Sequence, residues 1–183
     1  FEARDWTHGV LVGASMASET TAAATGAVGV VRRDSMAMKP FCGYNFGDYF
    51  AHWLSFDRPG ANLPKIFHVN WFRKGSDGKF LWPGFGDNLR VLEWMLKRCE
   101  GNADAVETPI GHLPKRADLN LGGLKISEHA VEQLLHIDEH GWAREFEAIA
   151  DYFDEFGART PAALKAEAAR ISAQLPGVEK KVA

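Results

Sequence analysis

The chain has 183 residues, of which 46% are hydrophobic and 25% charged, and its formal net charge at pH 7 is −3. This composition is typical of a globular protein with one sizeable core and argues against an intrinsically disordered chain. The sequence has no run of about 18 apolar residues, and its first residues lack the pattern of a signal peptide. We therefore expect a cytoplasmic protein with no membrane partner.

The first residue and the two cysteines support two further expectations. The chain begins with Phe1 and runs directly into an apolar segment, so we expect a piece of a longer polypeptide. Cys42 and Cys99 lie far apart and outside any CxxC spacing, which argues against a disulfide framework or a zinc knuckle. We expect both to be buried apolar side chains.

The first third of the chain is predicted to combine short strands with a helix. Residues 8–14 and 28–33 carry small and β-branched residues bounded by glycine, which favours two strands. Between them, residues 18–26 are mostly Ser, Thr and Ala, which predicts an exposed loop with one weak helical turn. Behind Asn45, a typical N-cap residue, apolar residues at helical spacing predict an amphipathic helix: Phe46, Tyr49, Phe50, Trp53 and Leu54.

A hairpin and a second helix are predicted next. Residues 65–72 are typical of a buried strand, residues 75–78 of a turn, and residues 79–82 of the partner strand. A helix should begin at Asp87 or Asn88, run to Cys99 and end at Gly101, with one apolar face formed by Val91, Leu92, Met95, Leu96 and Cys99.

The remainder is predicted to be mostly helical. One apolar stripe consists of Trp142, Phe146, Ile149 and Phe153, and a weaker one after Pro161 consists of Leu164, Ile171 and Leu175. The whole pattern predicts a mixed α/β chain that ends in helices.

Aromatic residues are concentrated in one part of the chain: 14 of the 21 Phe, Trp and Tyr residues fall between Phe41 and Trp94. They are densest in residues 70–74 and 80–88. Flat rings from a strand and a glycine-flanked turn can close on both faces of a planar base, and an Asn amide can bind its polar edge. A turn packed with aromatic side chains explains the same pattern, and the residues alone do not separate the two.

Charge in this region favours a phosphorylated small molecule. Residues 65–98 contain seven basic and three acidic residues, which suits phosphate but is far below the density of nucleic-acid-binding proteins. His136 and His140 lie four apart, but no third ligand accompanies them, so we predict no metal site. The Ala- and Thr-rich loop could be a lid that closes over a ligand, although surface loops of this kind are common.

Taken together, these motifs resemble the GTP-dependent phosphoenolpyruvate carboxykinase family over most of residues 6–112. Beyond about residue 115 the resemblance is only a similar helical pattern. The segments that carry it are Trp6 with 8–10, 18–19 with 21–24, Met38 with 40–41 and 43–45, 52–54, 63–73, 80–86, Asn88 and 108–111.

The resemblance implies a specific organisation. This stretch looks like the C-terminal third of the family's chain, the C-terminal part of a nucleotide-binding domain that contains a phosphate-binding P-loop. Residues 1–112 would provide a lid and a guanine pocket, and residues 113–183 the helical end of the same domain. The lid would span residues 18–28, with the functional residues Ser18, Glu19, Thr21, Ala22, Ala23 and Ala24. The guanine pocket would consist of Trp71, Phe72, Phe80, Phe85, Gly86, Asp87 and Asn88.

The resemblance also implies the chemistry. Oxaloacetate would lose CO2, and the resulting enolate would take the γ-phosphoryl group of GTP, giving phosphoenolpyruvate and GDP in gluconeogenesis. The family uses Mn²⁺ at the active site and a second Mg²⁺ or Mn²⁺ with the nucleotide. The phosphate loop, the manganese ligands and the oxaloacetate-binding arginines would lie upstream, in the remaining N-terminal part of the same enzyme, which we expect to be a monomer.

Four positions depart from the family pattern. Thr25 stands where an acidic residue is usual, Ala27 where a basic residue is common, Ala17 where Arg often occurs, and Asp87 replaces Glu. Two other function classes remain open. One is a module that stacks single-stranded nucleic acid on its aromatic residues, against which the net charge of −3 argues, and the other is a purely structural helical domain.

Overall fold

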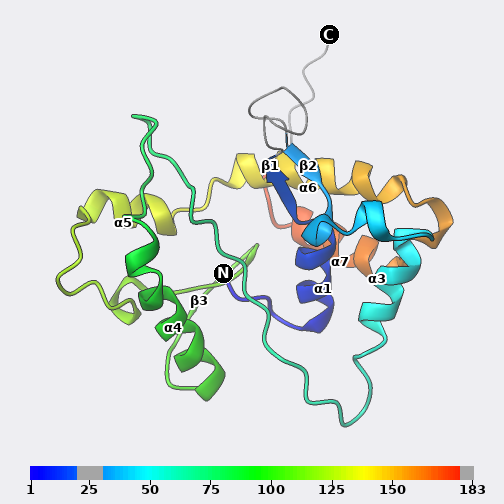
Figure 1. The fold of residues 1–183 in the computed structure, drawn as a ribbon, viewed down its shortest axis with the longest axis horizontal. Coiled ribbons are helices and arrows are strands. Elements are labelled where there is room, and N and C mark those ends of the chain that lie inside the picture. Colours follow the sequence, from blue (N-terminus) through cyan, green and yellow to red (C-terminus); the bar gives the residue numbers. More distant parts are fainter. Residues whose placement is uncertain (20–30, 178–183) are drawn as a thin grey trace. The chain divides into compact units, whose positions relative to one another are not determined.

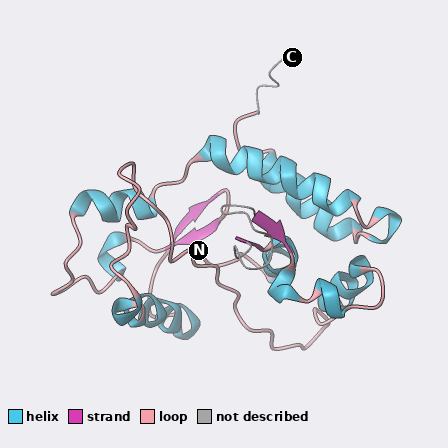
Figure 2. Ribbon diagram, turned by 45° about the horizontal axis from the view of Figure 1, so that its top comes forward, coloured by secondary structure: helices cyan, strands magenta, loops and turns pink. Residues whose placement is uncertain are grey.

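The computed structural model describes residues 1–19 and 31–177. Its contacts divide the chain into two compact units, each assembled from two separate segments. Unit 1 comprises Phe1–Arg4 and Lys65–Asp138, and unit 2 comprises Asp5–Pro64 and Glu139–Ala183. Helices and two short antiparallel strand pairs make up the regular structure of the described residues (Figures 1 and 2). The chain is therefore of the mixed α and β class, as predicted.

The core of unit 2 is formed by four helices: α1 (Trp6–Ser15), α3 (Phe46–Leu54), α6 (Glu139–Asp154) and α7 (Ala162–Ser172). Helix α7 contacts both α1 and α6, and α1 also contacts α3 (Figure 1). The predicted stripes of α6 and α7 face this core, since Phe146, Ile149, Phe153, Leu164, Ile171 and Leu175 are all buried. These two helices and α3, with its Asn45 cap, are confirmed.

The prediction of a strand at residues 8–14 is wrong, because this segment lies in helix α1. The Asp5 side chain accepts a hydrogen bond from the His8 backbone N–H at 2.8 Å, which caps the helix. Val10 and Leu11 are buried in the core of unit 2. Burial and the cap together outweigh the low helix propensity of valine and glycine here.

A two-stranded sheet follows α1. Strand β1 (Ala17–Glu19) pairs antiparallel with β2 (Val31–Arg33), with Ala17 opposite Arg33 and Glu19 opposite Val31. The strand predicted at residues 28–33 is thus confirmed over residues 31–33. The loop predicted between these strands lies outside the described residues from residue 20 to residue 30.

Two helical glycines in unit 2 give opposite predictions for stability. A Cβ at Gly47, in α3, would overlap the backbone carbonyl of Arg159, whereas a Cβ at Gly13, in α1, would lie 3.9 Å from Trp53. Gly47→Ala should therefore destabilise the protein by about 1–3 kcal/mol, because a backbone group must move. Gly13→Ala should be neutral or stabilising by up to about 1 kcal/mol. Thermal unfolding of both variants checks this, and a Gly47→Ala variant as stable as Gly13→Ala would contradict the packing of α3 on residues 157–159.

Unit 1 contains helix α4 (Leu89–Glu100), the hairpin of β3 (Val106–Thr108) and β4 (Gly111–Leu113), and helix α5 (Glu128–Leu135). The β3–β4 hairpin was not predicted. The predicted hairpin of residues 65–82 is correct only in part, since its turn forms but its strands do not. Gly75 N–H donates to Lys79 O and Leu81 N–H to Arg73 O, both at 2.9 Å, around one isolated bridge between Lys74 and Phe80.

Residues 65–68 instead pair with the first residues of the chain. Ala3 N–H donates to Ile66 O, and His68 N–H donates to Phe1 O. All of residues 65–72 are exposed or half-buried, so this segment lacks the buried faces of the strand that we predicted.

Helix α4 is confirmed, with Gly101 as a left-handed C-cap at φ 75°, but its predicted apolar face is wrong. Trp94 is the buried residue and packs edge-on against Phe67, with ring centroids 5.8 Å apart. Leu92 and Leu96 are exposed, and so is Cys99. The expectation that both cysteines are buried is therefore wrong, since Cys99 is exposed and Cys42 is only half-buried.

A buried ionic cluster joins three segments of unit 1. Glu2 is 3% exposed, and its carboxylate accepts hydrogen bonds from Lys65 Nζ at 2.5 Å and from Arg98 Nε at 2.6 Å. Glu2 also exchanges two backbone hydrogen bonds with His112 in β4. The N-terminal segment, residue 65, helix α4 and strand β4 are thereby tied together.

Candidate functional site

The residues of the predicted base pocket all belong to unit 1, on the irregular hairpin and just before α4. The hairpin brings Phe72 and Phe80 side by side, with ring centroids 5.9 Å apart and planes inclined by 64°. Phe72 is 71% exposed and Phe80 56% exposed. Two apolar rings are thus presented to solvent next to each other, which makes their faces available to a flat ligand.

Phe85 is the most exposed aromatic side chain of this segment, at 92%. It follows Gly84, whose φ of 138° is a conformation that side chains rarely allow, and it opens the 3₁₀ turn Phe85–Asp87. The glycine thus permits the sharp change of direction that places a phenylalanine ring in solvent. The ring buries little within the chain, so its faces are available to a ligand.

Two tryptophans of the same segment pack against each other. Trp71 and Trp82 have ring centroids 6.2 Å apart, and Trp82 is 8% exposed. The indole N–H of Trp82 donates to Oδ1 of Asn88 at 2.9 Å. Trp82 therefore links the hairpin to the residue that precedes α4.

Asp87 is engaged by Arg90, whose Nε donates to Asp87 Oδ1 at 3.0 Å. The same arginine donates to the carbonyl oxygens of Asn120 at 2.6 Å and Gly122 at 3.0 Å. Asp87 thus lies in a structural link between the start of α4 and residues 120–122. Its carboxylate orients Arg90, and the backbone of residues 85–88 is held in place.

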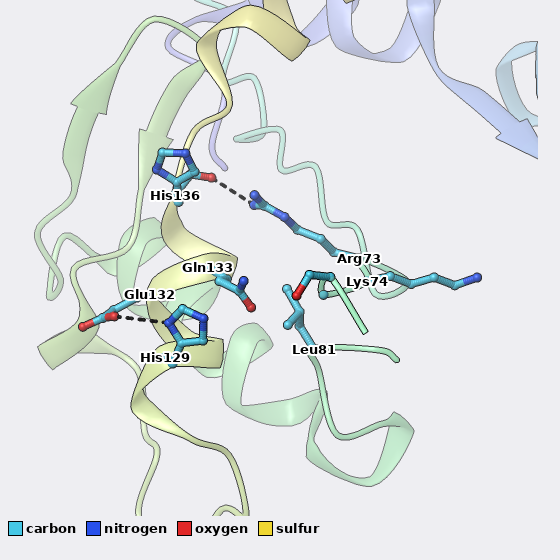
Figure 3. Close-up of a pocket in the computed structure, with 9 residues that line it drawn as sticks. Arg73, Lys74, Leu81, His129, Glu132, Gln133 and His136 are labelled. Carbon is cyan, nitrogen blue, oxygen red and sulfur yellow. Dashed lines mark hydrogen bonds and ion pairs between the residues drawn. The ribbon is translucent and has the colours of Figure 1, made fainter. Parts of the chain in front are cut away.

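Arg73, directly after Phe72, connects the hairpin to helix α5. Its guanidinium donates to the carbonyl oxygens of Leu134 at 3.2 Å and His136 at 3.0 Å, at the C-terminal end of α5 (Figure 3). An open cavity of about 360 Å³ lies here, lined by Arg73, Lys74, Gly75, Ser76, Leu81, His129, Glu132, Gln133 and His136. Lys74 extends away from the α5 residues in Figure 3, and its Nζ lies 5.5 Å from the centre of the Phe80 ring.

All seven predicted pocket residues belong to unit 1: Trp71, Phe72, Phe80, Phe85, Gly86, Asp87 and Asn88. Ring contacts join Phe72 to Phe80 and Trp71 to Trp82, and a hydrogen bond joins Trp82 to Asn88. The cavity beside α5 is lined by none of the seven. Trp82, Arg73 and Arg90 hold these residues in place, and no role was predicted for them from the sequence. Trp82 lay within the dense aromatic run, but only the structure shows that its N–H reaches Asn88.

The predicted lid residues belong to unit 2 or are not described. Ser18 and Glu19 lie in strand β1, and Thr21, Ala22, Ala23 and Ala24 lie outside the described residues. Within residues 1–19 and 31–177, no group of three or more His, Cys, Asp or Glu side chains could hold a metal ion. In the same ranges no helix combines the length and the apolar character needed to cross a membrane.

Comparison with known proteins matches residues 1–174 to the family described as "Phosphoenolpyruvate carboxykinase C-terminal P-loop domain". The chain is 55% identical over 157 residues to phosphoenolpyruvate carboxykinase [GTP] of Thermoplasma volcanium, an alignment that covers 86% of this chain and 26% of the relative. It is 53% identical over 168 residues to the enzyme of the same name from Renibacterium salmoninarum, covering 91% of this chain and 28% of that relative. With the enzyme of that name from Chlamydia trachomatis it shares 51% identity over 176 residues, or 96% of this chain and 29% of the relative.

The chain spans between a quarter and a third of the length of these relatives. The family match covers nearly all of both units, and it includes the exposed rings, Asn88 and the hairpin that carries them. The chain belongs to the phosphoenolpyruvate carboxykinase family, in the part described as its C-terminal P-loop domain.

Proposed function

We propose that these residues serve a GTP-dependent phosphoenolpyruvate carboxykinase and supply the pocket for the guanine base of GTP. The full enzyme converts oxaloacetate and GTP to phosphoenolpyruvate, GDP and CO2, a reaction of gluconeogenesis. The observation that carries the proposal is the exposure of the rings of Phe72, Phe80 and Phe85 in the same unit as the half-buried Asn88. Rings can stack on a base, and the amide can bind its polar edge.

Positioning of the phosphates and of the reacting atoms is assigned to residues outside this chain. Residues 1–183 contain no GxxxxGK[ST] motif, and the relatives that share this segment are more than three times as long. Phosphoryl transfer depends almost entirely on positioning and charge stabilisation. A bound Mn²⁺, with Mg²⁺ or Mn²⁺ on the nucleotide, would provide the charge stabilisation, and the described residues include no cluster suited to hold either ion.

Residues 18–28 are proposed as a lid over the reacting atoms. The enolate formed by decarboxylation picks up a proton in water and becomes pyruvate unless solvent is excluded, so a closing segment determines the product. The composition of the segment supports this role, because Ala and Thr side chains make few contacts and closure stays readily reversible. We also propose that the enzyme acts as a monomer in the cytoplasm.

The test compares the 183-residue chain with the full-length carboxykinase that contains it. We expect the full-length enzyme to form phosphoenolpyruvate from oxaloacetate with GTP far better than with ATP, and the 183-residue chain alone to form none. Formation of phosphoenolpyruvate by the short chain would contradict the assignment of the phosphate-positioning groups to other residues. Equal use of ATP and GTP by the full-length enzyme would contradict the guanine pocket.

A further inference from the structure

We propose that Trp82 is a positioning residue for base selection, because its indole N–H sets the orientation of the Asn88 amide toward the nucleotide. This inference rests on the guanine pocket proposed above and names the group that makes the pocket selective. Trp82 does not contact the base in this proposal; it acts through Asn88.

The contact settles which end of the amide faces the tryptophan. The indole Nε1 lies 2.9 Å from Oδ1 of Asn88, and an indole N–H can only donate a hydrogen bond. The oxygen of the amide must therefore face Trp82, since the NH2 group in that position would meet another donor. A planar amide held in this way directs its NH2 group to the opposite side, and no other hydrogen bond joins the Asn88 side chain to a described residue.

The Asn88 side chain does not cap helix α4. Asn88 occupies the N-cap position of α4, where Asn is strongly preferred because its side chain accepts from the first backbone N–H groups. Asp5, Asn45 and Ser127 make such bonds at the starts of α1, α3 and α5. The Asn88 side chain makes none, because its backbone is already helical, at φ −61° and ψ −29°, after the 3₁₀ turn Phe85–Asp87. Its amide is therefore left to accept from Trp82.

Trp82 is rigidly placed for this role. Its side chain is buried at 8% exposure, and its ring packs against that of Trp71. The next residues, Pro83 and Gly84, turn the chain so that residues 85–88 return toward the indole. A buried indole N–H that loses its acceptor is left unsatisfied, which costs free energy, so the hydrogen bond holds the Asn88 oxygen in place.

The orientation of the amide selects between purines at position 6 of the ring. Guanine and hypoxanthine carry an oxygen there, which accepts a hydrogen bond from an NH2 group, whereas adenine carries an amino group, which would meet a second donor. A site that presents a donor leaves that donor unpaired with the wrong base, which is a strong basis for rejection. Without Trp82, the amide could turn by half a rotation and present its oxygen to adenine.

The test uses the full-length carboxykinase with Trp82→Phe and three nucleotides: GTP, inosine triphosphate and 2-aminopurine riboside triphosphate, which has no group at position 6. We expect the KM values of GTP and inosine triphosphate to rise about tenfold, and that of the 2-aminopurine nucleotide to change by less than about twofold. The value of kcat should stay near that of the wild type, because the phosphates are positioned elsewhere. An equal rise for all three nucleotides, or no rise for any, would overturn the role of Trp82.

Trp94→Phe is the matched control. Trp94 is also buried in unit 1, but its indole nitrogen has no hydrogen-bond partner, so the same truncation removes no oriented contact. This variant should leave the ratios among the three KM values unchanged. If Trp82→Phe does not fold, 3-benzothienylalanine is placed at position 82 instead: it keeps the fused ring but has no N–H donor, and it should show the same loss for the two 6-oxo nucleotides.

The outcomes separate this inference from the proposed function. A wild-type enzyme with no carboxykinase activity, or without preference for GTP, refutes the proposed function itself. A wild-type enzyme that prefers GTP, together with a uniform effect of Trp82→Phe, refutes only the positioning role.

Discussion

Phe85→Ala should raise the KM of GTP in the full-length carboxykinase by roughly 5- to 150-fold, because loss of a stacked ring costs about 1–3 kcal/mol of binding free energy. Phe85 is 92% exposed. The residue before it, Gly84, has a φ of 138°, a backbone conformation that favours glycine. The ring therefore contributes little to folding and is available to a base. The KM of oxaloacetate and the melting temperature should be nearly unchanged.

Leu89→Ala provides the control for this experiment. Leu89 is 74% exposed, begins helix α4 and lies four residues after Phe85, so its truncation removes a comparable apolar side chain outside the predicted pocket. The KM of GTP should not respond to it. If Phe85→Ala and Leu89→Ala have the same effect on the KM of GTP, Phe85 does not stack on the base.

Glu2→Gln should lower the free energy of unfolding at pH 7 by about 2–4 kcal/mol. The buried carboxylate receives hydrogen bonds from both Lys65 and Arg98, and the amide would leave two cations facing a group without charge. We expect a smaller loss of unfolding free energy than for a fully buried ion pair, because the Lys65 side chain is 40% exposed and water can partly solvate it. Chemical denaturation at pH 7 measures the difference.

The effect of Glu2 should depend on pH in a defined direction. Burial by itself would raise the pKa of Glu2, but the hydrogen bonds from Arg98 and Lys65 and their positive charges hold the pKa below its ordinary value of 4.5. A carboxyl group with a lowered pKa in the folded state stabilises the protein above pH 4.5, and this contribution is lost as the pH falls through the folded-state pKa. The wild-type and Glu2→Gln proteins should therefore converge in stability below pH 4.5.

Glu93→Gln is the matched comparison for Glu2. Glu93 also pairs with a lysine, Lys97, one turn along α4, but both side chains are more than 40% exposed. Solvent screens such a pair, so the variant should unfold at nearly the wild-type temperature. A Glu2→Gln protein as stable as Glu93→Gln at pH 7 would show that the buried cluster does not stabilise unit 1.

The sequence predicted helices best where a cap and an apolar stripe coincide. Asn45 with its aromatic stripe, Gly101 after α4, and Pro161 before α7 all mark ends that the structure confirms. Helix α1 was missed because valines and glycines suggested a strand, although Asp5 carried the capping signal. In that segment burial against other helices outweighs local helix propensity. Local propensities carry no information about that burial.

The side that a helix buries was harder to predict than the helix itself. The spacing of Leu92 and Leu96 suggested the buried face of α4, whereas Trp94 is the residue that packs inside unit 1. Which face is covered depends on the partners, here Phe67, which is 27 positions away along the chain. The contacts that organise the candidate site are of the same kind, because the bond from Trp82 to Asn88 requires the turn at residues 83–87 to form first.

The interleaved composition of the two units determines the order in which they can fold. The edge formed by residues 1–4 needs residues 66, 68 and 112 as hydrogen-bond partners, so this edge cannot close until most of unit 1 has been synthesised. Unit 2 needs a longer stretch of chain, since α1 is made early but packs against α7, and Phe50 of α3 packs against Phe153 of α6. Its apolar faces therefore remain uncovered during most of translation. Loop closure over such separations slows folding, and chaperone binding to nascent chains would act in this interval.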